Sequence, residues 1–154
     1  MGADGMKIGA RLDEARIRAL REQFDHPGLM RLLGVRIADL RLGLAELHLP
    51  FRADLAQHHG FFHAGASSSI ADQAGGIAGF TMFPEGSSVL TVEFKLNLIN
   101  PAKGDLLQAV GRVIKPGRTL TICQLDVWSV SGDTRQHVAT GLQTLIRIPT
   151  PDPN

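Results

Sequence analysis

The sequence predicts an α+β domain in which a curved antiparallel sheet of five or six strands wraps around one central helix. Residues 57–82 read as a polar loop that leads into a single apolar helix, because Ile70, Ala74 and Ile77 recur at helical spacing. Segments of strand character lie on both sides of this stretch. One long apolar helix among many strands is best buried when the sheet curves around it.

Composition indicates an ordinary globular domain. The 154 residues suffice for one core, with 44% apolar residues and a net charge of +1. This charge and an aromatic content of 5% give no basis for binding nucleic acid. No apolar run approaches the length needed to cross a bilayer, so no membrane partner is expected. Residues 1–6 lack the apolar centre of a signal peptide. The single Cys123 excludes a disulfide within the chain, so we expect a cytoplasmic protein.

Residues 1–33 are expected to form an N-terminal extension before the main domain. Residues 11–24 read as an amphipathic helix that ends at His26-Pro27-Gly28, and residues 29–33 as a short helical turn. Residues 35–49 predict two strands joined by a tight turn near Asp39 to Arg41. The loop at residues 51–59 then leads to the helix.

The strands after the helix are separated by clear turn signals. We expect strands at residues 89–98, 106–114, 119–130 and 136–148, so that the domain spans 34–148 and 149–154 form a flexible tail. In the first of these strands, plain alternation places Leu90 and Phe94 on one face. Thr91 then lies on the other face, unless a β-bulge turns it around.

Asp72 is the unusual residue of the predicted helix. Its neighbours one turn away are small, namely Ser68, Ser69, Gly75 and Gly76. Glycines cost roughly 1 kcal/mol each in a helix interior, so burial must hold this helix, and another backbone or a ligand can approach it closely. A carboxylate in that setting is either a functional group or a solvent-facing charge at the polar edge of the helix.

The spacing around Asp72 resembles a known family. His63-Ala64-Gly65 is followed by Asp72 nine residues after the histidine, Gln57 lies six residues before it, and Thr91 falls in the next strand. This pattern is similar to that of the hotdog-fold acyl-CoA thioesterases, in particular the phenylacetyl-CoA (PaaI-like) branch, over residues 34–148. The family usually has Gly-Gly after the histidine. Here Ala64 replaces the first glycine but keeps the backbone N–H.

The resemblance implies a hotdog domain that hydrolyses the thioester of an aryl- or medium-chain acyl-CoA. Hotdog proteins assemble as homodimers or homotetramers, and their site combines the helix start of one subunit with the acidic residue of another. Asp72 would act as general base or nucleophile. The N–H groups of Ala64 and Gly65 would stabilise the oxyanion, with Gln57 and His63 as orienting groups and Thr91 as a further site residue.

Coenzyme A enters only as part of the substrate, and no separate cofactor is expected. Its phosphates require cations, for which the candidates are Lys95, Lys103, Lys115 and Arg118. The resemblance places the 115–118 hairpin at the CoA phosphates, and the fork of Arg118 suits phosphate best. Phe62 is a candidate for contact with the acyl group.

Other chemistries fit the sequence less well. His59 and His63 are four residues apart, but Gly60 stands where zinc hydrolases need Glu, so no metal is predicted. Ser67 lacks the strand and second glycine of a nucleophile elbow. Two alternatives of different class stay open: an enoyl-CoA hydratase or dehydratase of the same fold, and a non-catalytic acyl-CoA sensor.

Overall fold

The computed structural model describes residues 7–25 and 28–150. The expected helix stop at His26-Pro27 and the end of the expected tail, residues 151–154, lie outside the described residues. The helices are α1 (Glu14–Phe24), α2 (Leu29–Leu33) and α3 (Ala64–Phe80), with a short 3₁₀ turn at Ala53–Leu55. The strands are β1 (Arg36–Arg41), β2 (Leu44–Pro50), β3 (Ser87–Leu98), β4 (Leu106–Lys115), β5 (Leu120–Ser131) and β6 (Thr134–Pro149).

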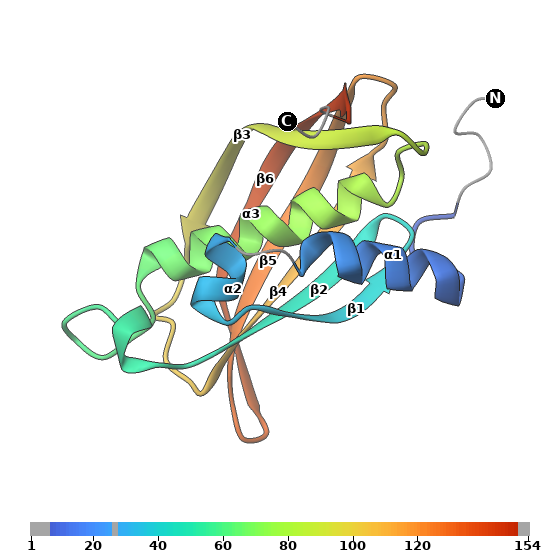
Figure 1. Ribbon diagram of the computed structural model, residues 1–154. Helices are drawn as coiled ribbons and strands as arrows, with labels where there is room; N and C mark the ends of the chain where they lie inside the picture. Colours follow the sequence, from blue (N-terminus) through green and yellow to red (C-terminus); the bar gives the residue numbers. More distant parts are fainter. Residues whose placement is uncertain (1–6, 26–27, 151–154) are drawn as a thin grey trace.

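The strands form one six-stranded antiparallel sheet in the order β1-β2-β4-β5-β6-β3. The sheet curves around α3, and α1 and α2 lie on the same side of the sheet as α3 (Figure 1). Phe24 of α1 packs edge to face on Phe80 at the end of α3, with ring centroids 5.9 Å apart. The α+β architecture expected from the sequence is confirmed, with six strands.

The central helix lies directly against the sheet because small residues face each other there. Ile70, Ala74 and Ile77 are at most 1% exposed. A Cβ built on Gly111 of β4 would lie 2.3 Å from the backbone carbon of Ala74, so only glycine permits this approach. The expectation that burial holds α3 and that its small residues admit close neighbours is therefore met on its sheet-facing side.

The turn predicted near Asp39 to Arg41 is wrong. These residues belong to β1 and pair with β2, and the chain reverses at Leu42-Gly43 instead. Gly43 has φ of 68°, which glycine adopts without strain, and its N–H donates to the Thr81 hydroxyl at 2.7 Å. The polar side chains that suggested a turn pair with each other, Arg41 to Asp39 at 2.8 Å, on the exposed strand.

The prediction that the faces of β3 alternate plainly is also wrong. A β-bulge turns Thr91 to the other face. The register of β3 against β6 shifts between Thr91 and Glu93, which marks a β-bulge. Thr91 lies opposite Leu145 and Phe94 lies opposite Gln143. Because residues directly opposite in a sheet share a face, and both partners are fully buried, Thr91 and Phe94 face α3. Leu90 takes the outer face.

Candidate functional site

The loop before α3 is held in a fixed shape by backbone hydrogen bonds. The Gln57 N–H donates to the Phe61 carbonyl at 2.8 Å, the Gly60 N–H donates back to Gln57, and Gly60 has φ of 81°. His63 then caps the helix, because its Nδ1 accepts from the Gly65 N–H at 2.8 Å. A neutral His63 ring in this role carries its proton on Nε2.

The two N–H groups expected at the oxyanion site therefore differ. The Gly65 N–H is engaged by His63, whereas the Ala64 N–H has no hydrogen-bond partner among the described residues. The positive end of the helix dipole adds to the donor strength at this position. Ala64 is the better placed of the two expected donors.

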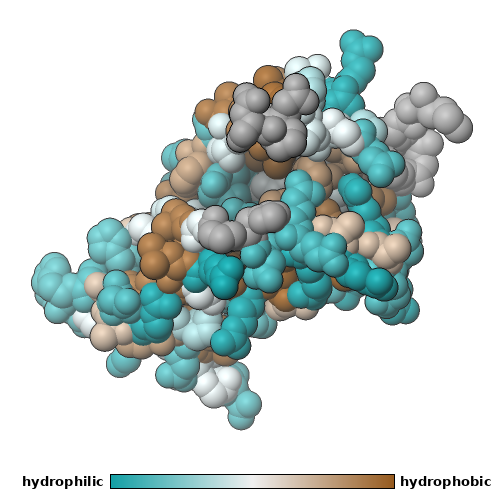
Figure 2. Space-filling model, viewed as in Figure 1, coloured by the Kyte–Doolittle hydropathy of each residue, from teal (hydrophilic) through white to brown (hydrophobic). Residues whose placement is uncertain are grey.

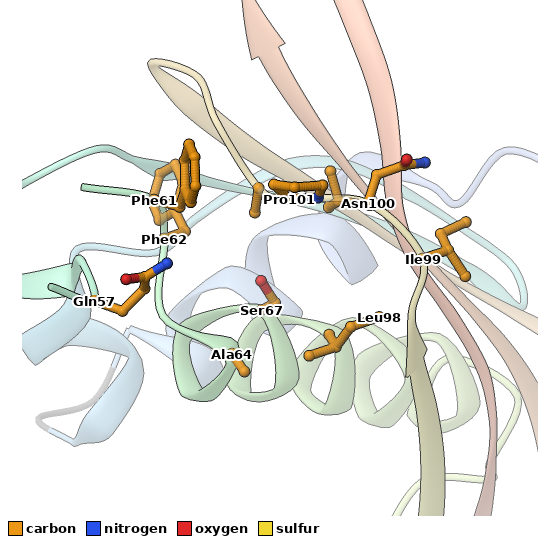
Figure 3. A pocket seen from close by; sticks show the side chains of 11 residues that line it. Gln57, Phe61, Phe62, Ala64, Ser67, Leu98, Ile99, Asn100 and Pro101 are labelled. Atoms are coloured by element: carbon orange, nitrogen blue, oxygen red, sulfur yellow. The ribbon is translucent and has the colours of Figure 1, made fainter. Parts of the chain in front are cut away.

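A pocket of about 500 Å³ opens beside Ala64 (Figure 3). Its polar members include Gln57 and Ser67, and the Gln57 Oε1 accepts from the His59 N–H at 2.5 Å. Phe62 borders the pocket but is only 4% exposed, because it packs edge to face on Phe51 at 5.1 Å. The remaining lining residues are mostly apolar: Phe61, Leu98, Ile99, Asn100, Pro101, Ala102 and Val138.

Asp72 lies further along α3 and is half-buried. Residues of the sheet donate hydrogen bonds to its side chain. Its Oδ1 accepts two hydrogen bonds, from the Thr91 hydroxyl at 2.8 Å and from the Gln143 Nε2 at 2.6 Å. Gln143 Nε2 also reaches the Asp72 backbone carbonyl at 3.0 Å and Thr91 Oγ1 at 3.2 Å. Oδ2 has no hydrogen-bond partner among the described residues, so one carboxylate oxygen is fixed and the other stays open.

Gln143 was not among the residues proposed from the sequence. It occupies a position of β6 where the neighbouring helix-facing residues, Ala139, Gly141 and Leu145, are small or apolar, and it is fully buried. A polar residue in the apolar series of a strand was the signal that could have identified it. Gln143 is separated from Asp72 by 71 residues in the sequence, so the contact could not be inferred from local spacing.

Asp72 and the helix start cannot serve the same carbonyl within one chain. They are eight residues apart on α3, or about 12 Å at 1.5 Å per residue. Gln57, His63, Ala64 and Gly65 form one group at the start of the helix, and Asp72 with Thr91 forms another.

The basic candidates for CoA lie in different places. Lys103 is exposed in the loop beside the helix start, where the adjacent Ala102 carbonyl accepts from the Phe62 N–H. Lys115, the last residue of β4, and Arg118, in the β4–β5 connection, are exposed at the opposite end of the sheet. Lys95 lies opposite Leu142 on the outer face of β3 and β6. One chain therefore does not gather these four cations at one place.

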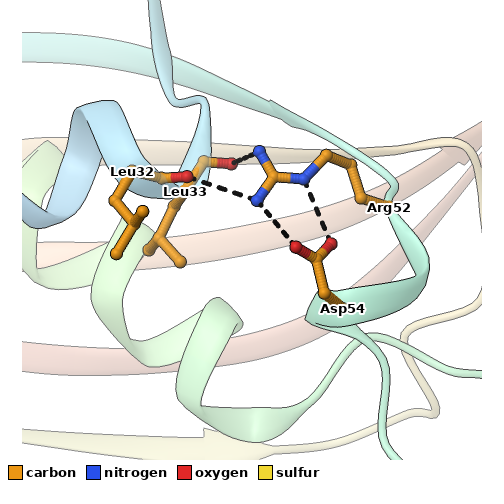
Figure 4. Close-up of polar contacts among 4 residues, drawn as sticks. All are labelled: Leu32, Leu33, Arg52 and Asp54. Carbon is orange, nitrogen blue, oxygen red and sulfur yellow. Dashed lines mark hydrogen bonds and ion pairs between the residues drawn. The ribbon is translucent and has the colours of Figure 1, made fainter.

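Arg52 connects the N-terminal extension to the loop before α3 (Figure 4). Its guanidinium donates to the carbonyls of Leu32 and Leu33 at 3.2 Å and pairs with Asp54 at 3.2 Å. Hydrogen bonding from Arg52 holds the pKa of the Asp54 carboxyl below its usual value. Figure 2 shows hydrophobic atoms over α2, where Leu29 and Leu32 are 56% and 72% exposed.

The model of the thioesterase superfamily matches residues 59–135, which contain the helix start, Asp72 and Thr91. The chain belongs to the thioesterase superfamily. It is thus a thioester hydrolase by family, and its six-stranded sheet around one helix is the hotdog fold. The resemblance read from the motif is confirmed at the level of family and fold.

Three relatives illustrate the match. The crystal structure of a thioesterase family protein from Silicibacter pomeroyi is 38% identical with a TM-score of 0.83, covering 86% of this chain and 98% of that one. The proofreading thioesterase EntH of Klebsiella pneumoniae is 29% identical over 65% of this chain and 73% of its own. The PaaI protein of E. coli, 20% identical with a TM-score of 0.75 over 86% and 92% of the two chains, shares the fold.

Within residues 7–25 and 28–150, no three His, Cys, Asp or Glu side chains gather in a group that could hold a metal ion. The helices of that same part are all too short or too polar to cross a bilayer.

Proposed function

We propose that this superfamily member hydrolyses acyl-CoA thioesters, with Asp72 of one subunit acting on a thioester held at the helix start of a second. The observation that carries the proposal is the asymmetry of the Asp72 carboxylate. Oδ1 is fixed by Thr91 and Gln143, and Oδ2 has no partner among the described residues. An oriented, half-buried carboxylate with one open oxygen suits either general-base or nucleophilic chemistry.

The oxyanion donor in this proposal is the Ala64 N–H. It borders the apolar pocket, whereas the Gly65 N–H already donates to His63. As the thioester carbonyl becomes tetrahedral, its oxygen gains negative charge that this N–H and the helix dipole stabilise. Gln57, on the pocket wall, orients the thioester, and His63 fixes the first turn of the helix.

The second subunit is needed because the two halves of the site are about 12 Å apart in one chain. The edge strand β3 offers a surface for it, since Leu90, Val92, Phe94 and Leu98 are 41–56% exposed. Two copies that join these edges antiparallel around a two-fold axis form one continuous sheet and place their α3 helices side by side in opposite directions. The helix start of each copy then lies near Asp72 of the other.

The same symmetry brings the basic residues together. Lys103 lies at the helix-start end of its chain, and Lys115 and Arg118 lie at the opposite end. Because the two copies run antiparallel about this axis, the helix-start end of one lies beside the opposite end of the other. Lys103 of one copy therefore comes to the same end of the dimer as Arg118 of the other. We propose that these cations bind the CoA phosphates. Lys95, on the outer sheet face, is a weaker candidate.

The apolar pocket is proposed to hold an aryl or medium-chain acyl group. Phe61, Leu98 and Pro101 supply flat and branched surfaces, and the volume of about 500 Å³ lies within the range of small-ligand sites. The buried, unpaired Cys123 is typical of a reducing compartment, which supports the proposed cytoplasmic location.

Two routes use the open oxygen of Asp72. As general base, it takes a proton from water; the resulting oxygen attacks the carbonyl carbon, and the C–S bond breaks with CoA leaving as thiolate, which then takes up the proton. As nucleophile, Oδ2 itself attacks, expels the thiolate and forms a mixed anhydride that water then cleaves. When water attacks the Asp72 Cγ of the anhydride, ¹⁸O from water enters Asp72 in a single turnover, and this label identifies the second route.

The proposal is tested by thiol release from phenylacetyl-, benzoyl-, hexanoyl-, palmitoyl- and acetyl-CoA, with wild type beside Asp72→Asn. We expect turnover of an aryl or medium-chain member, and a fall in kcat of about a hundredfold or more in the folded variant, the usual scale for losing an acid–base group. Turnover that survives the substitution would remove Asp72 from the mechanism. A folded wild type that releases no thiol favours the hydratase or the sensor.

A further inference from the structure

We propose that Gln143 is the positioning residue of this site: it fixes the Asp72 carboxylate so that Oδ2 faces the reaction. The inference rests on the proposed function of Asp72 and adds a residue to it. Gln143 is fully buried, comes from β6, and directs its amide group at both the side chain and the backbone carbonyl of Asp72.

The orientation of the Gln143 amide follows from its neighbours. The Asp72 carbonyl and Oδ1 are acceptors at 3.0 and 2.6 Å, so the group that faces them is the NH₂. The Oε1 then points at α3, where it is buried without a hydrogen-bond partner among the described residues. A buried acceptor of this kind lowers stability.

Gly75 of α3 provides the space for this arrangement. A Cβ built on Gly75 would lie 1.8 Å from Gln143 Oε1 and 2.6 Å from Leu125 Cδ2. A glycine inside a helix is destabilising relative to alanine. Two destabilising features, an unpaired buried oxygen and a mid-helix glycine, thus coincide where the amide meets Asp72. Because both features lower stability, we attribute their presence to the positioning of Asp72 by the amide.

Gln143 and Thr91 act on the same oxygen. Both donate to Oδ1, and Gln143 Nε2 lies 3.2 Å from Thr91 Oγ1, so the carboxylate is held through Oδ1 while Oδ2 has no hydrogen-bond partner among the described residues. Loss of the amide leaves only the exposed Thr91 hydroxyl, which rotates with its own side chain. A displacement of about 1 Å at a reacting group can cost on the order of a hundredfold in rate.

The decisive variant is Gln143→Met, which keeps the length of the side chain and removes both the donor and the unpaired oxygen. We expect kcat to fall about tenfold to a hundredfold with KM nearly unchanged. Loss of the bond to the carboxylate and removal of the unpaired Oε1 act in opposite directions on stability, so kcat is measured where the variant is fully folded. A merely structural Gln143 gives a variant that, once folded, retains the wild-type kcat, and that result overturns the proposal.

A matched pair of glycine variants provides an independent test. Gly75→Ala pushes directly on Gln143, whereas Gly79→Ala pushes on Leu145, with a Cβ 2.3 Å from Leu145 Cδ1. Both add one methyl group to the buried face of α3. We expect a much larger loss of kcat in Gly75→Ala than in Gly79→Ala at a similar loss of stability. Equal losses of kcat contradict a specific role for Gln143.

A double variant separates this inference from the proposed function. In the Asp72→Asn background, Gln143→Met is expected to cause no further loss of residual turnover, because it acts through Asp72. A further loss as large as that in wild type overturns the proposal. If wild type hydrolyses none of the thioesters, the proposed function fails, and the crystal structure of Gln143→Met decides on positioning. An Asp72 side chain unchanged there overturns it.

Discussion

At the scale of single residues, the site depends on how one carboxylate is held. Asp72 receives two hydrogen bonds on Oδ1, one from Thr91 and one from Gln143. Hydrogen bonds to a charged group contribute about 1.5–3 kcal/mol each, which is enough to keep a side chain in one rotamer.

Thr91 is expected to assist Asp72 through its hydroxyl alone. Replacing Thr91 with Ala removes a donor to a charged acceptor, and we predict a fall in kcat of about tenfold, from a hydrogen bond near the lower end of the 1.5–3 kcal/mol range. Thr91→Ser keeps the hydroxyl and is predicted to retain most of the activity. Steady-state kinetics on the best acyl-CoA check both variants, and equal losses would assign Thr91 a packing role.

The residues of the proposed site could be named from the sequence where they follow one another in the chain. The series from Gln57 through Ala64 to Asp72 has family spacing, so its members could be named from the sequence. Gln143 could not, because its contact with Asp72 depends on β6 lying beneath α3 with Gly75 between them. That the Gly65 N–H donates to the neighbouring His63 Nδ1 was equally hidden in the sequence.

At the scale of the elements, the bulge in β3 controls which side chains reach the helix. Without the extra residue between Thr91 and Glu93, plain alternation would place Thr91 on the outer face. Alternation of apolar residues located the strand correctly but not its faces. The turn at Gly43 was missed for a related reason, since polar residues in an exposed strand resemble a turn.

The contact between β5 and α3 makes stability depend on pH. Cys123 is buried against α3, with its thiol 3.6 Å from the Gly75 carbonyl, and burial raises its pKa from 9.0 to about 12. The unfolded thiol ionises above pH 9 while the folded thiol stays protonated. The stabilising effect of the protonated thiol is therefore complete below pH 9 and is lost as the pH rises toward 12.

We predict that this loss is visible in urea unfolding between pH 9 and 12. A shift of three pKa units corresponds to roughly 4 kcal/mol as an upper value. The control is Cys123→Ser, which retains a donor for the Gly75 carbonyl but does not ionise in this range. The variant should have a flatter pH dependence than wild type, and the absence of tyrosine simplifies the comparison. Parallel curves would contradict the assignment to Cys123.

At the scale of the whole molecule, one chain carries two incomplete half-sites. The helix start has a donor and a pocket without a carboxylate, and Asp72 has a carboxylate without an oxyanion donor. The exposed apolar side chains of the edge strand β3 are suited to pairing with a second copy. The fold and both proposed half-sites are present in one chain, whereas the shared site that we propose needs a second copy, which the sequence pattern does not place.

Disruption of this edge is predicted to abolish assembly and activity together. Phe94 is 41% exposed on β3, and Phe94→Lys places a charge in the proposed interface. Leu120→Lys is the control, because Leu120 is 48% exposed on β5, away from the edge. Light scattering should give twice the chain mass, or a multiple of it, for wild type and control, and the chain mass for Phe94→Lys. A monomeric, fully active Phe94→Lys would contradict a shared site.

The most direct test of the shared site is complementation between two inactive variants. Asp72→Asn removes the carboxylate. Ala64→Pro removes one N–H at the first position of α3, where proline fits a helix and the extended His63 precedes it. The two variants are unfolded together, refolded and assayed for thiol release. Random pairing should restore about a quarter of wild-type activity, because half the dimers then contain one intact site. A mixture no more active than its parents would show that each site lies within one chain.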